Sequence, residues 1–325
     1  SPVLWLLALL AVAALWVSRK DSAPRPGAGP IVLSRLSGAV ASPALSPDGR
    51  LLAFSWDRES RGNADIWVRD VGSNTLTRLT TDPAPDGSPA FSPDGLRIAF
   101  LRFPSPERSQ VLVVPAGGGA ESVVAEGKLI RPGMTWSRDG RALVVAERAT
   151  LGEPSRLSRL SVETGEKAPL THPPALYRAG DSAPSLSPDG RTLAFARHVS
   201  GTSGELWLLA VTDDLAAAGE PVALCEEGWD SGGNAWTPDG KRVVFSVTRG
   251  FGAEPSGLMA IDVVPRGRLA KPLAGTGRGR SPTSSRTGEL AFLRPLADDN
   301  VWRIPLEGGR AGGAVPIAAS PRKDV

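Results

Sequence analysis

Short, mostly apolar runs recur along the chain at a nearly constant spacing. Their apolar residues cluster or alternate and do not follow the spacing of a helix, so the pattern predicts strands. Each run follows a polar four-residue signature that begins with Ser or Thr and ends with Gly. The runs are LLAF at 51–54, RIAF at 97–100, ALVV at 142–145, TLAF at 192–195, RVVF at 242–245 and ELAF at 289–292.

The signatures themselves predict tight turns. They read SPDG at 46–49, 92–95 and 187–190, TPDG at 237–240, SRDG at 137–140, and a degenerate SRTG at 285–288. Pro presets φ for a turn, Asp can bond to its own nearby backbone, and Gly accepts the positive φ that other residues resist. The structural turn residues are therefore Asp48, Gly49, Asp94, Gly95, Asp139, Gly140, Asp189, Gly190, Asp239 and Gly240.

Spacing of the signatures indicates the architecture. Successive signature glycines lie 46, 45, 50, 50 and 48 residues apart, a period typical of solenoids and propellers. A first strand precedes each turn. Third strands follow, such as DIWVRDV at 65–71, and so do fourth strands, such as LTRLT at 76–80 and its counterparts near Val123, Leu170, Val222, Pro272 and Pro316. Four antiparallel strands per period form a blade, so we predict an all-β fold, a β-propeller of six visible four-stranded blades.

Both ends of the repeat region bear on how the ring closes. Residues 31–36, IVLSRL, resemble an outermost strand without its own blade, and we expect them to pair with the final blade. Residues 320–325, SPRKDV, resemble the beginning of another unit. The sequence therefore leaves six to eight blades open for the intact ring.

The N-terminal region differs from the rest. Residues 3–17, VLWLLALLAVAALWV, carry no charge and are flanked by Arg19 and Lys20. We expect a transmembrane helix over 1–20, a Pro/Gly-rich linker over 21–30 and the propeller over 31–325, truncated at its C-terminus. A cleaved signal peptide is the alternative. Arg19 and Lys20 by themselves would hold their side of the span in the cytoplasm.

Composition excludes several functions. The 37 Lys and Arg and the 34 Asp and Glu give a net charge of +3 and form no charged run, so we expect no nucleic-acid binding. A single cysteine excludes an intrachain disulfide, and only two histidines are present. Because no catalytic or metal-binding motif occurs, we expect no enzymatic activity, no metal and no cofactor. His172 is expected in an exposed loop.

An arginine recurs just beyond the second strand of every blade. If the blades superpose, these arginines lie near one rim, where they can bind an anionic ligand or an acidic peptide. Alternatively, each pairs with an acid of its own or a neighbouring blade, such as Asp65, Glu205 or Asp299 on the third strand. The six are Arg58, Arg102, Arg148, Arg197, Arg249 and Arg294.

Loops that lead from each fourth strand to the next first strand emerge on the same face. They carry charged residues beside Tyr177 and Trp229, a combination that suits protein recognition. Solvated loops are the alternative. The charged residues are Asp86, Arg131, Arg178, Asp181 and Asp230.

Together, the SPDG-x-x-[IL]-A-F signature, the [DE]-[IL]-W third strand and the L-T-x-x-T fourth strand resemble the TolB-type, WD40-like propeller repeats of bacteria. The resemblance covers residues 31–319, with the third and sixth signatures departing from it. Residues 54–95 look closest to repeats of large bacterial membrane proteins, in which a cytoplasmic kinase or winged-helix domain precedes one membrane helix. The resemblance implies a single-pass inner-membrane protein with a periplasmic propeller.

Three functions follow as expectations. The first is a non-catalytic propeller that binds an unknown protein, peptide or anionic ligand as the extracytoplasmic sensor of a signalling protein. The second is a substrate-gating propeller of a prolyl-oligopeptidase-like serine hydrolase. The third is a soluble TolB-like periplasmic partner. A propeller fold hosts unrelated activities, so it does not decide among them.

Overall fold

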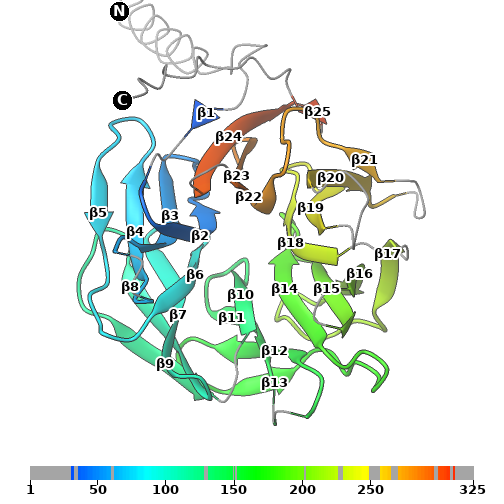
Figure 1. Cartoon of the computed structure of the whole chain (residues 1–325). Coiled ribbons are helices and arrows are strands. Elements are labelled where there is room, and N and C mark those ends of the chain that lie inside the picture. The colour runs from blue at the N-terminus through cyan, green and yellow to red at the C-terminus, as the bar shows by residue number, and fades with distance from the viewer. Residues whose placement is uncertain are drawn as a thin grey trace, which may run out of the picture.

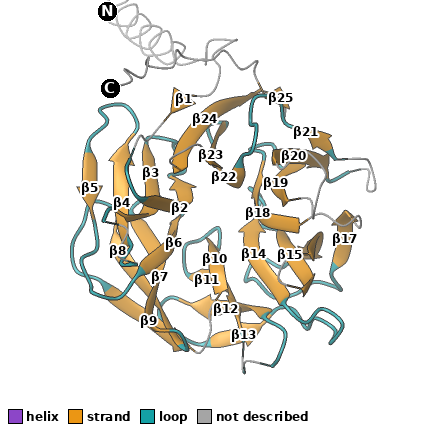
Figure 2. Cartoon of the chain, viewed as in Figure 1, coloured by secondary structure: helices purple, strands orange, loops and turns teal. Residues whose placement is uncertain are grey.

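The computed structural model describes most of the repeat region. It covers residues 31–32, 36–59, 62–127, 131–148, 150, 152–200, 203–225, 230–248, 257–264, 270–295, 299–307 and 310–311. Within these residues every regular element is a β-strand, as the orange arrows in Figure 2 show. The all-β prediction is confirmed.

Six antiparallel sheets surround a central axis (Figure 1). In each of the first five blades the strands pair in chain order, from the innermost to the outermost. The first two blades consist of β2 (Ala39–Leu45), β3 (Leu51–Asp57), β4 (Asp65–Asp70) and β5 (Leu76–Arg78), and of β6 (Asp86–Phe91), β7 (Arg97–Ser105), β8 (Arg108–Pro115) and β9 (Ser122–Gly127). The third and fourth consist of β10 (Arg131–Trp136), β11 (Ala142–Glu147), β12 (Arg156–Ser161) and β13 (Lys167–Pro169), and of β14 (Gly180–Leu186), β15 (Thr192–Ser200), β16 (Ser203–Ala210) and β17 (Val222–Cys225).

The fifth blade consists of β18 (Asp230–Trp236), β19 (Arg242–Thr248), β20 (Gly257–Asp262) and β21 (Lys271–Pro272). The sixth takes β22 (Arg280–Ser284), β23 (Glu289–Pro295) and β24 (Asp299–Glu307), and a short β25 (Arg310–Ala311) pairs with β24. Its outermost strand comes from the other end of the repeat region. That strand is β1 (Ile31–Val32), with Ile31 opposite Arg303 and Val32 opposite Trp302.

The pairing of β1 with β24 joins the two ends of the repeat region and closes the ring. Figure 1 shows β1 beside β24. The predicted pairing of residues 31–36 with the final blade is thereby confirmed at Ile31 and Val32. The first and sixth blades also meet along their inner strands, where the Leu45 amide donates to Thr283 Oγ1 at 3.2 Å. The ring is complete with six blades, the lower end of the predicted range.

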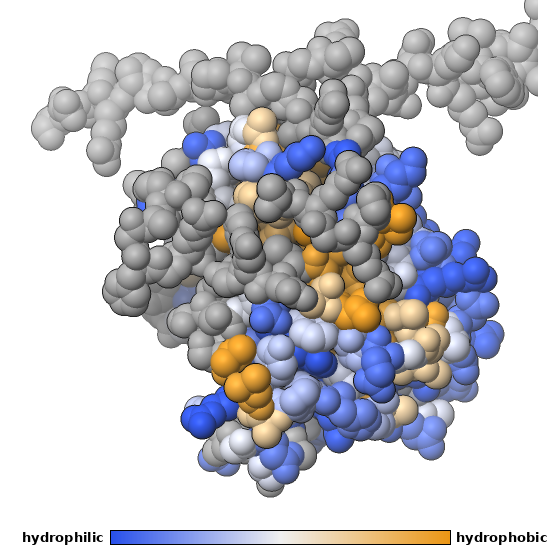
Figure 3. Space-filling view, turned by 90° about the vertical axis from the view of Figure 1, so that its right-hand side faces the viewer, coloured by the Kyte–Doolittle hydropathy of each residue, from blue (hydrophilic) through white to orange (hydrophobic). Residues whose placement is uncertain are grey.

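The hydrophobic core lies between the blades. It forms six clusters, and each joins residues of two neighbouring blades, including the first and the sixth. Within β3, Leu52 and Phe54 pack toward the sixth blade while Ala53 packs toward the second. A strand buried on both faces needs apolar residues at successive positions, which explains the runs that end in Ala-Phe. On the side drawn in Figure 3, hydrophilic residues dominate the described surface.

The signature turn has one geometry in the first five blades. In the first, Ser46 Oγ donates to Asp48 Oδ1 at 2.6 Å and accepts from the Leu51 amide at 2.9 Å. Asp48 Oδ1 also accepts from the Arg50 amide, and Gly49 has a φ of 73°. The predicted roles of Asp and Gly are confirmed. In the sixth blade the hydrogen-bonded turn is one residue shorter: the amide of Glu289 donates to Ser285 Oγ four residues away, whereas the corresponding bond of the other turns spans five residues.

The predicted transmembrane helix over 1–20 and the linker over 21–30 lie outside the described residues. Among the residues that are described, no helix is long and apolar enough to cross a membrane.

Candidate functional site

Every inner strand carries a β-bulge four residues before its signature turn. The pairing register shifts at this point in all six blades. At each bulge a small residue adopts a positive φ, a conformation that only a few per cent of non-glycine residues adopt. These residues are Ser42 (49°), Ser88 (53°), Gly133 (99°), Ala183 (50°), Gly233 (148°) and Ser281 (51°).

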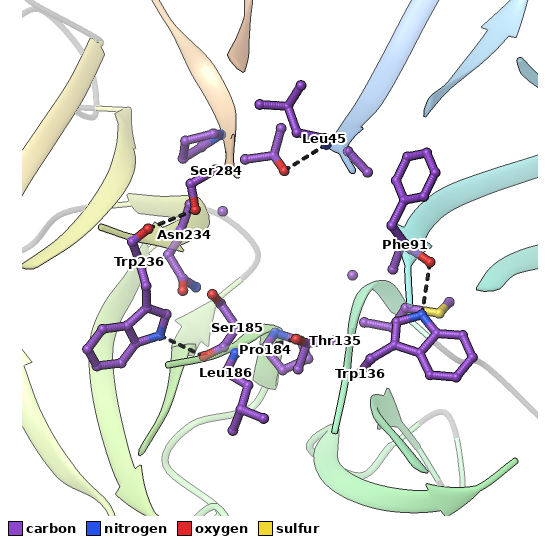
Figure 4. A pocket seen from close by; sticks show the side chains of 18 of the residues that line it. Leu45, Phe91, Thr135, Trp136, Pro184, Ser185, Leu186, Asn234, Trp236 and Ser284 are labelled. Carbon is purple, nitrogen blue, oxygen red and sulfur yellow. Dashed lines mark hydrogen bonds between the residues drawn. The ribbon is translucent and has the colours of Figure 1, made fainter. Parts of the chain in front are cut away.

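Hydrogen bonds fasten each inner strand to the preceding blade. The indole nitrogen of Trp136 donates to the carbonyl of Ala90, and that of Trp236 donates to the carbonyl of Ser185, each at 2.9 Å. Ser284 Oγ donates to the carbonyl of Trp236 at 2.7 Å (Figure 4). These bonds are part-buried, and they link neighbouring inner strands around the axis.

An axial cavity of about 430 Å³ lies among these strands, between the bulges and the signature turns. All six blades contribute to its wall, and Figure 4 shows part of it. This volume falls in the range of ligand pockets. The wall consists of prolines, small residues and hydroxyl groups, with larger apolar groups such as Phe91, Trp136, Leu186 and Trp236.

Only two charged side chains line the cavity among its described residues, Arg138 and Arg286. They occupy the second position of the third and sixth signatures, where the other four have Pro47, Pro93, Pro188 and Pro238. In a ring of six, the third and sixth blades lie on opposite sides. Apart from these two arginines, the described wall of the cavity is uncharged. The arginines come from opposite blades, at the end of the cavity formed by the signature turns, which we call its mouth.

The arginines predicted to form a ring differ from one another in their burial and in their contacts. Arg102 and Arg197 are buried, and each makes a bidentate ion pair, with Asp86 at 2.8 Å and Asp181 at 2.7 Å respectively. Arg102 also contacts Asp82 and Glu121. Both pairs fasten the inner strand of a blade to its second strand.

The other members of the predicted ring make weaker contacts. Arg58 is exposed, with its guanidinium 5.8 Å from the Trp56 ring centre, and Arg294 lies 5.0 Å from that of Trp302. Arg148 Nη2 donates to the carbonyl of Ala179 at 3.1 Å. Arg249 lies outside the described residues. Whether a ligand contacts these arginines stays a prediction.

The alternative that each arginine pairs with an acid of its own or a neighbouring blade is confirmed for the two buried arginines, although their acids are not the third-strand residues given as examples. Their partners come from the inner strand, because Asp86 stands opposite Arg102, and Asp181 opposite Arg197, in the strand register. Asp65 instead pairs with Arg78 at 2.7 Å. Glu205 accepts from the Trp207 indole nitrogen at 2.9 Å.

The loop residues that were predicted to form a recognition face also differ in burial. Arg178 is exposed and Tyr177 is half-buried, with its ring centre 6.0 Å from that of Trp207. The backbone of Asp230 begins β18, and Arg131 begins β10, whereas Trp229 lies outside the described residues. His172 is exposed, as predicted.

Electrostatics distinguish the two ends of the ring. Burial raises the pKa of Asp86 and of Asp181, although their arginines oppose that effect. The hydrogen bond to Asp86 raises the pKa of Arg102 above its ordinary value. At the signature turns the serine hydroxyl and a backbone amide lower the pKa of Asp48, Asp94 and Asp189. Those carboxylates are charged at neutral pH.

In the part of the chain that the structure describes, no three His, Cys, Asp or Glu side chains gather closely enough to hold a metal ion.

The cavity escaped prediction, although the sequence contains its signal. Four residues before each signature stands Ser, Gly or Ala, and in four blades Pro follows it, at Pro43, Pro89, Pro184 and Pro282. Small residues before a Pro, repeated in register with the turn, indicate a constrained backbone. The role of the signature serine hydroxyl was also missed.

Comparison with known proteins places the chain among propellers. The family model of the TolB β-propeller domain matches residues 29–218. The chain is 30% identical over 168 residues to the uncharacterised peptidase YuxL of Bacillus subtilis, covering 49% of this chain and 22% of YuxL. It is 31% identical over 230 residues to tricorn protease homologue 1 of Streptomyces coelicolor, covering 65% of this chain and 19% of that protein. The chain thus matches about a fifth of each relative.

Solved structures share the fold. TolB from Acinetobacter baumannii superposes with a TM-score of 0.63 at 19% identity, over 77% of this chain and 58% of that one. A prolyl endopeptidase superposes with a TM-score of 0.59 at 19% identity, over 86% of this chain and 41% of that one. The propeller fold is therefore common to TolB and to the propeller domains of prolyl peptidases.

Proposed function

Because the chain belongs to the TolB β-propeller domain family, we propose that it is a non-catalytic binding propeller whose axial cavity holds its ligand. The observation that carries this proposal is the cavity itself, which all six blades line between the bulges and the signature turns. Hydrogen bonds between neighbouring inner strands hold its wall in place. A preformed wall reduces the entropy that a ligand loses on binding.

The wall is suited to binding and offers little for catalysis. Its described residues include no His, Cys, Asp, Glu or Lys that could act as a general acid or base. Hydroxyl groups and prolines alternate with half-buried apolar side chains such as Phe91 and Leu186. Such a surface suits the side chains and backbone of a short peptide segment.

The test combines selection and footprinting. A displayed library of random peptides is selected on the whole chain, and a selected peptide is then added during hydroxyl-radical labelling. We expect the peptide to reduce labelling at Phe91 and Leu186, which line the cavity. Labelling at Val123 on β9, which is 55% exposed, serves as the internal control and should not change.

Leu176, in the loop between β13 and β14, is 70% exposed and reports on the opposite end of the ring. Protection confined to Val123 or to Leu176, with Phe91 and Leu186 labelled as before, would overturn the proposal. So would hydrolysis of the selected peptides by the purified chain at a rate above that of buffer, since the cavity wall would then serve a reaction.

We also propose a setting for this propeller, as the extracytoplasmic sensor of a larger membrane signalling protein anchored by residues 3–17. The support is the uncharged run of those residues and the Pro/Gly-rich stretch that follows it. An alkaline phosphatase fusion after Lys20 should be active in bacteria, because that enzyme matures outside the cytoplasm. An inactive phosphatase, paired with an active β-galactosidase at the same junction, would contradict this setting.

A second candidate is a substrate-gating propeller of a serine hydrolase. The similarity to YuxL and to tricorn protease homologue 1 favours it, because both are named as peptidases. The complete reading frame separates the candidates. A Gly-x-Ser-x-Gly elbow with later Asp and His supports the hydrolase, whereas a kinase or winged-helix domain supports the sensor.

A further inference from the structure

Arg138 and Arg286 stand out among the cations of the molecule, because they replace proline in a repeated turn. Pro at this position presets the turn, so replacing it gives up conformational preference in the third and sixth blades. Both arginine side chains are exposed at the cavity mouth. The third turn keeps the common geometry without Pro, so a proline at this position is not required for the turn.

Their contacts leave most of their donors free. Arg138 Nη1 donates to the carbonyl of Asp189 at 3.3 Å, and Arg286 Nη1 donates to the carbonyl of Pro93 at 3.2 Å. Among the described residues, no carboxylate forms an ion pair with either guanidinium. A guanidinium has five N–H donors, so each retains donors for a ligand.

The carbonyl partners also orient the two side chains. Arg286 belongs to the sixth blade and Pro93 to the second, so this arginine reaches past the first blade along the mouth. Arg138 of the third blade reaches the fourth. Both guanidinium groups are thus held at the rim of the cavity.

Carboxylates of the signature turns do not cancel these charges. None of Asp48, Asp94, Asp139, Asp189 and Asp239 lines the cavity, because each bonds to the hydroxyl and an amide of its own turn. Each also interacts with a cation of its own blade, such as Arg50 with Asp48 and Arg191 with Asp189. The sixth signature has Thr287 in place of Asp. Arg138 and Arg286 are therefore the charges that a ligand in the cavity meets.

We propose that this mouth binds an acidic peptide segment, with Asp or Glu side chains held between Arg138 and Arg286. The inference rests on the proposed binding function and adds the chemistry of the ligand. A carboxylate matches the planar fork of a guanidinium, and two cations at one mouth, one directed to the second blade and the other to the fourth, favour a ligand with more than one acid. The uncharged remainder of the cavity accepts the peptide around them. The side chains of Trp136 and Trp236 are buried, which leaves little ring face for a base to stack on and so disfavours a nucleotide.

The test measures fluorescence anisotropy with a labelled peptide of alternating Gly, Asp, Ser and Glu, and with the same peptide carrying Asn and Gln. We expect the acidic peptide to bind and the amide peptide to bind at least ~10-fold more weakly, as charge-assisted hydrogen bonds predict. Arg138→Gln and Arg286→Gln should each weaken binding about tenfold. Restoring the signature with Arg138→Pro should weaken it equally without loss of folding.

Arg191→Gln is the matched control, because Arg191 follows a signature turn at the same end but does not line the cavity. It should leave the affinity within about twofold. Equal affinities of the wild-type and the Arg138 and Arg286 variants would overturn the inference, as would equal affinities of the acidic and amide peptides. Inorganic phosphate that competes at a lower concentration than the acidic peptide would also overturn it in favour of a free anion. If the acidic peptide fails these tests while neutral peptides from the library still protect Phe91 and Leu186, the binding function stands and this inference alone fails.

Discussion

At the scale of single residues, one polar turn is used repeatedly. The signature serine links two strands through its hydroxyl, and the aspartate accepts hydrogen bonds from that hydroxyl and from a backbone amide. The aspartate is mostly exposed, so its contribution comes from local hydrogen bonds and not from burial. Replacing it therefore tests the turn alone.

Asp94→Asn should lower the free energy of unfolding at neutral pH by about 1 kcal/mol, because the oxygen that accepts these hydrogen bonds loses its negative charge. Ser92 and the Leu96 amide hold the pKa of Asp94 below its ordinary value. A lowered pKa contributes stability above the unfolded pKa, about 3.9, and loses it as the pH falls through the folded value. Urea unfolding should show that the difference between variant and wild type shrinks in acid. A difference that is constant with pH would contradict the role of the charge.

The buried ion pair of Arg102 and Asp86 is also a residue-scale feature. Arg102→Leu should cost about 3–5 kcal/mol in urea unfolding, because the carboxylate of Asp86 is left buried without its cation. The double variant with Asp86→Leu should recover much of this loss. Arg108→Leu, on an arginine that is 66% exposed, should stay within about 0.5 kcal/mol. A loss for Arg102→Leu no larger than that of the control would show that the pair is not structural.

At the scale of elements, the bulged inner strand is the feature that builds the cavity. Each bulge residue adopts a positive φ and is the first residue of the segment that lines the wall. The bulge therefore both bends the strand and sets its direction toward the axis.

Ser42, with a φ of 49°, tests this geometry. Ser42→Gly should change the free energy of unfolding by less than about 1 kcal/mol, because Gly accepts this conformation. Ser42→Val should destabilise the chain by about 1–3 kcal/mol, because a β-branched residue strains there. Urea unfolding of both variants makes the comparison, and equal stability of the two would contradict the assignment of a left-handed bulge.

The difference between turn and bulge also explains how far the sequence could be interpreted. The signature is local, and its Pro, Asp and Gly have known turn chemistry, so six blades and their strands followed from it. The bulge residues are also repeated, but Ser, Ala and Gly have many uses and gave no prediction. The partners of Arg102 and Arg197 depend on the strand register, which shifts at the bulge, and the sequence does not display that shift.

At the scale of the whole molecule, the ring depends on one strand shared between its ends. Ile31 and Val32 supply the outer strand of the sixth blade, and the sixth blade packs on the first through a common core. Closure keeps the inner strands of both blades at the cavity wall. An open seam would distort the cavity.

Replacing Ile31 and Val32 together by Pro should loosen the sixth blade, because Pro cannot donate to the strand ladder. Hydrogen exchange measured by mass spectrometry should become faster in β24, residues 299–307. Exchange in β12, residues 156–161, on the opposite side of the ring, should not change. Unaltered exchange in β24 would show that β1 does not secure the seam.

The axial cavity as the binding site is the central claim, and a crystal structure of the whole chain with a selected peptide tests it most directly. Our account predicts peptide density along the axis, between the bulge residues and the mouth formed by Arg138 and Arg286. Peptide density on the outer strands or over the loops of the opposite end, with the axial cavity empty of peptide, would contradict it.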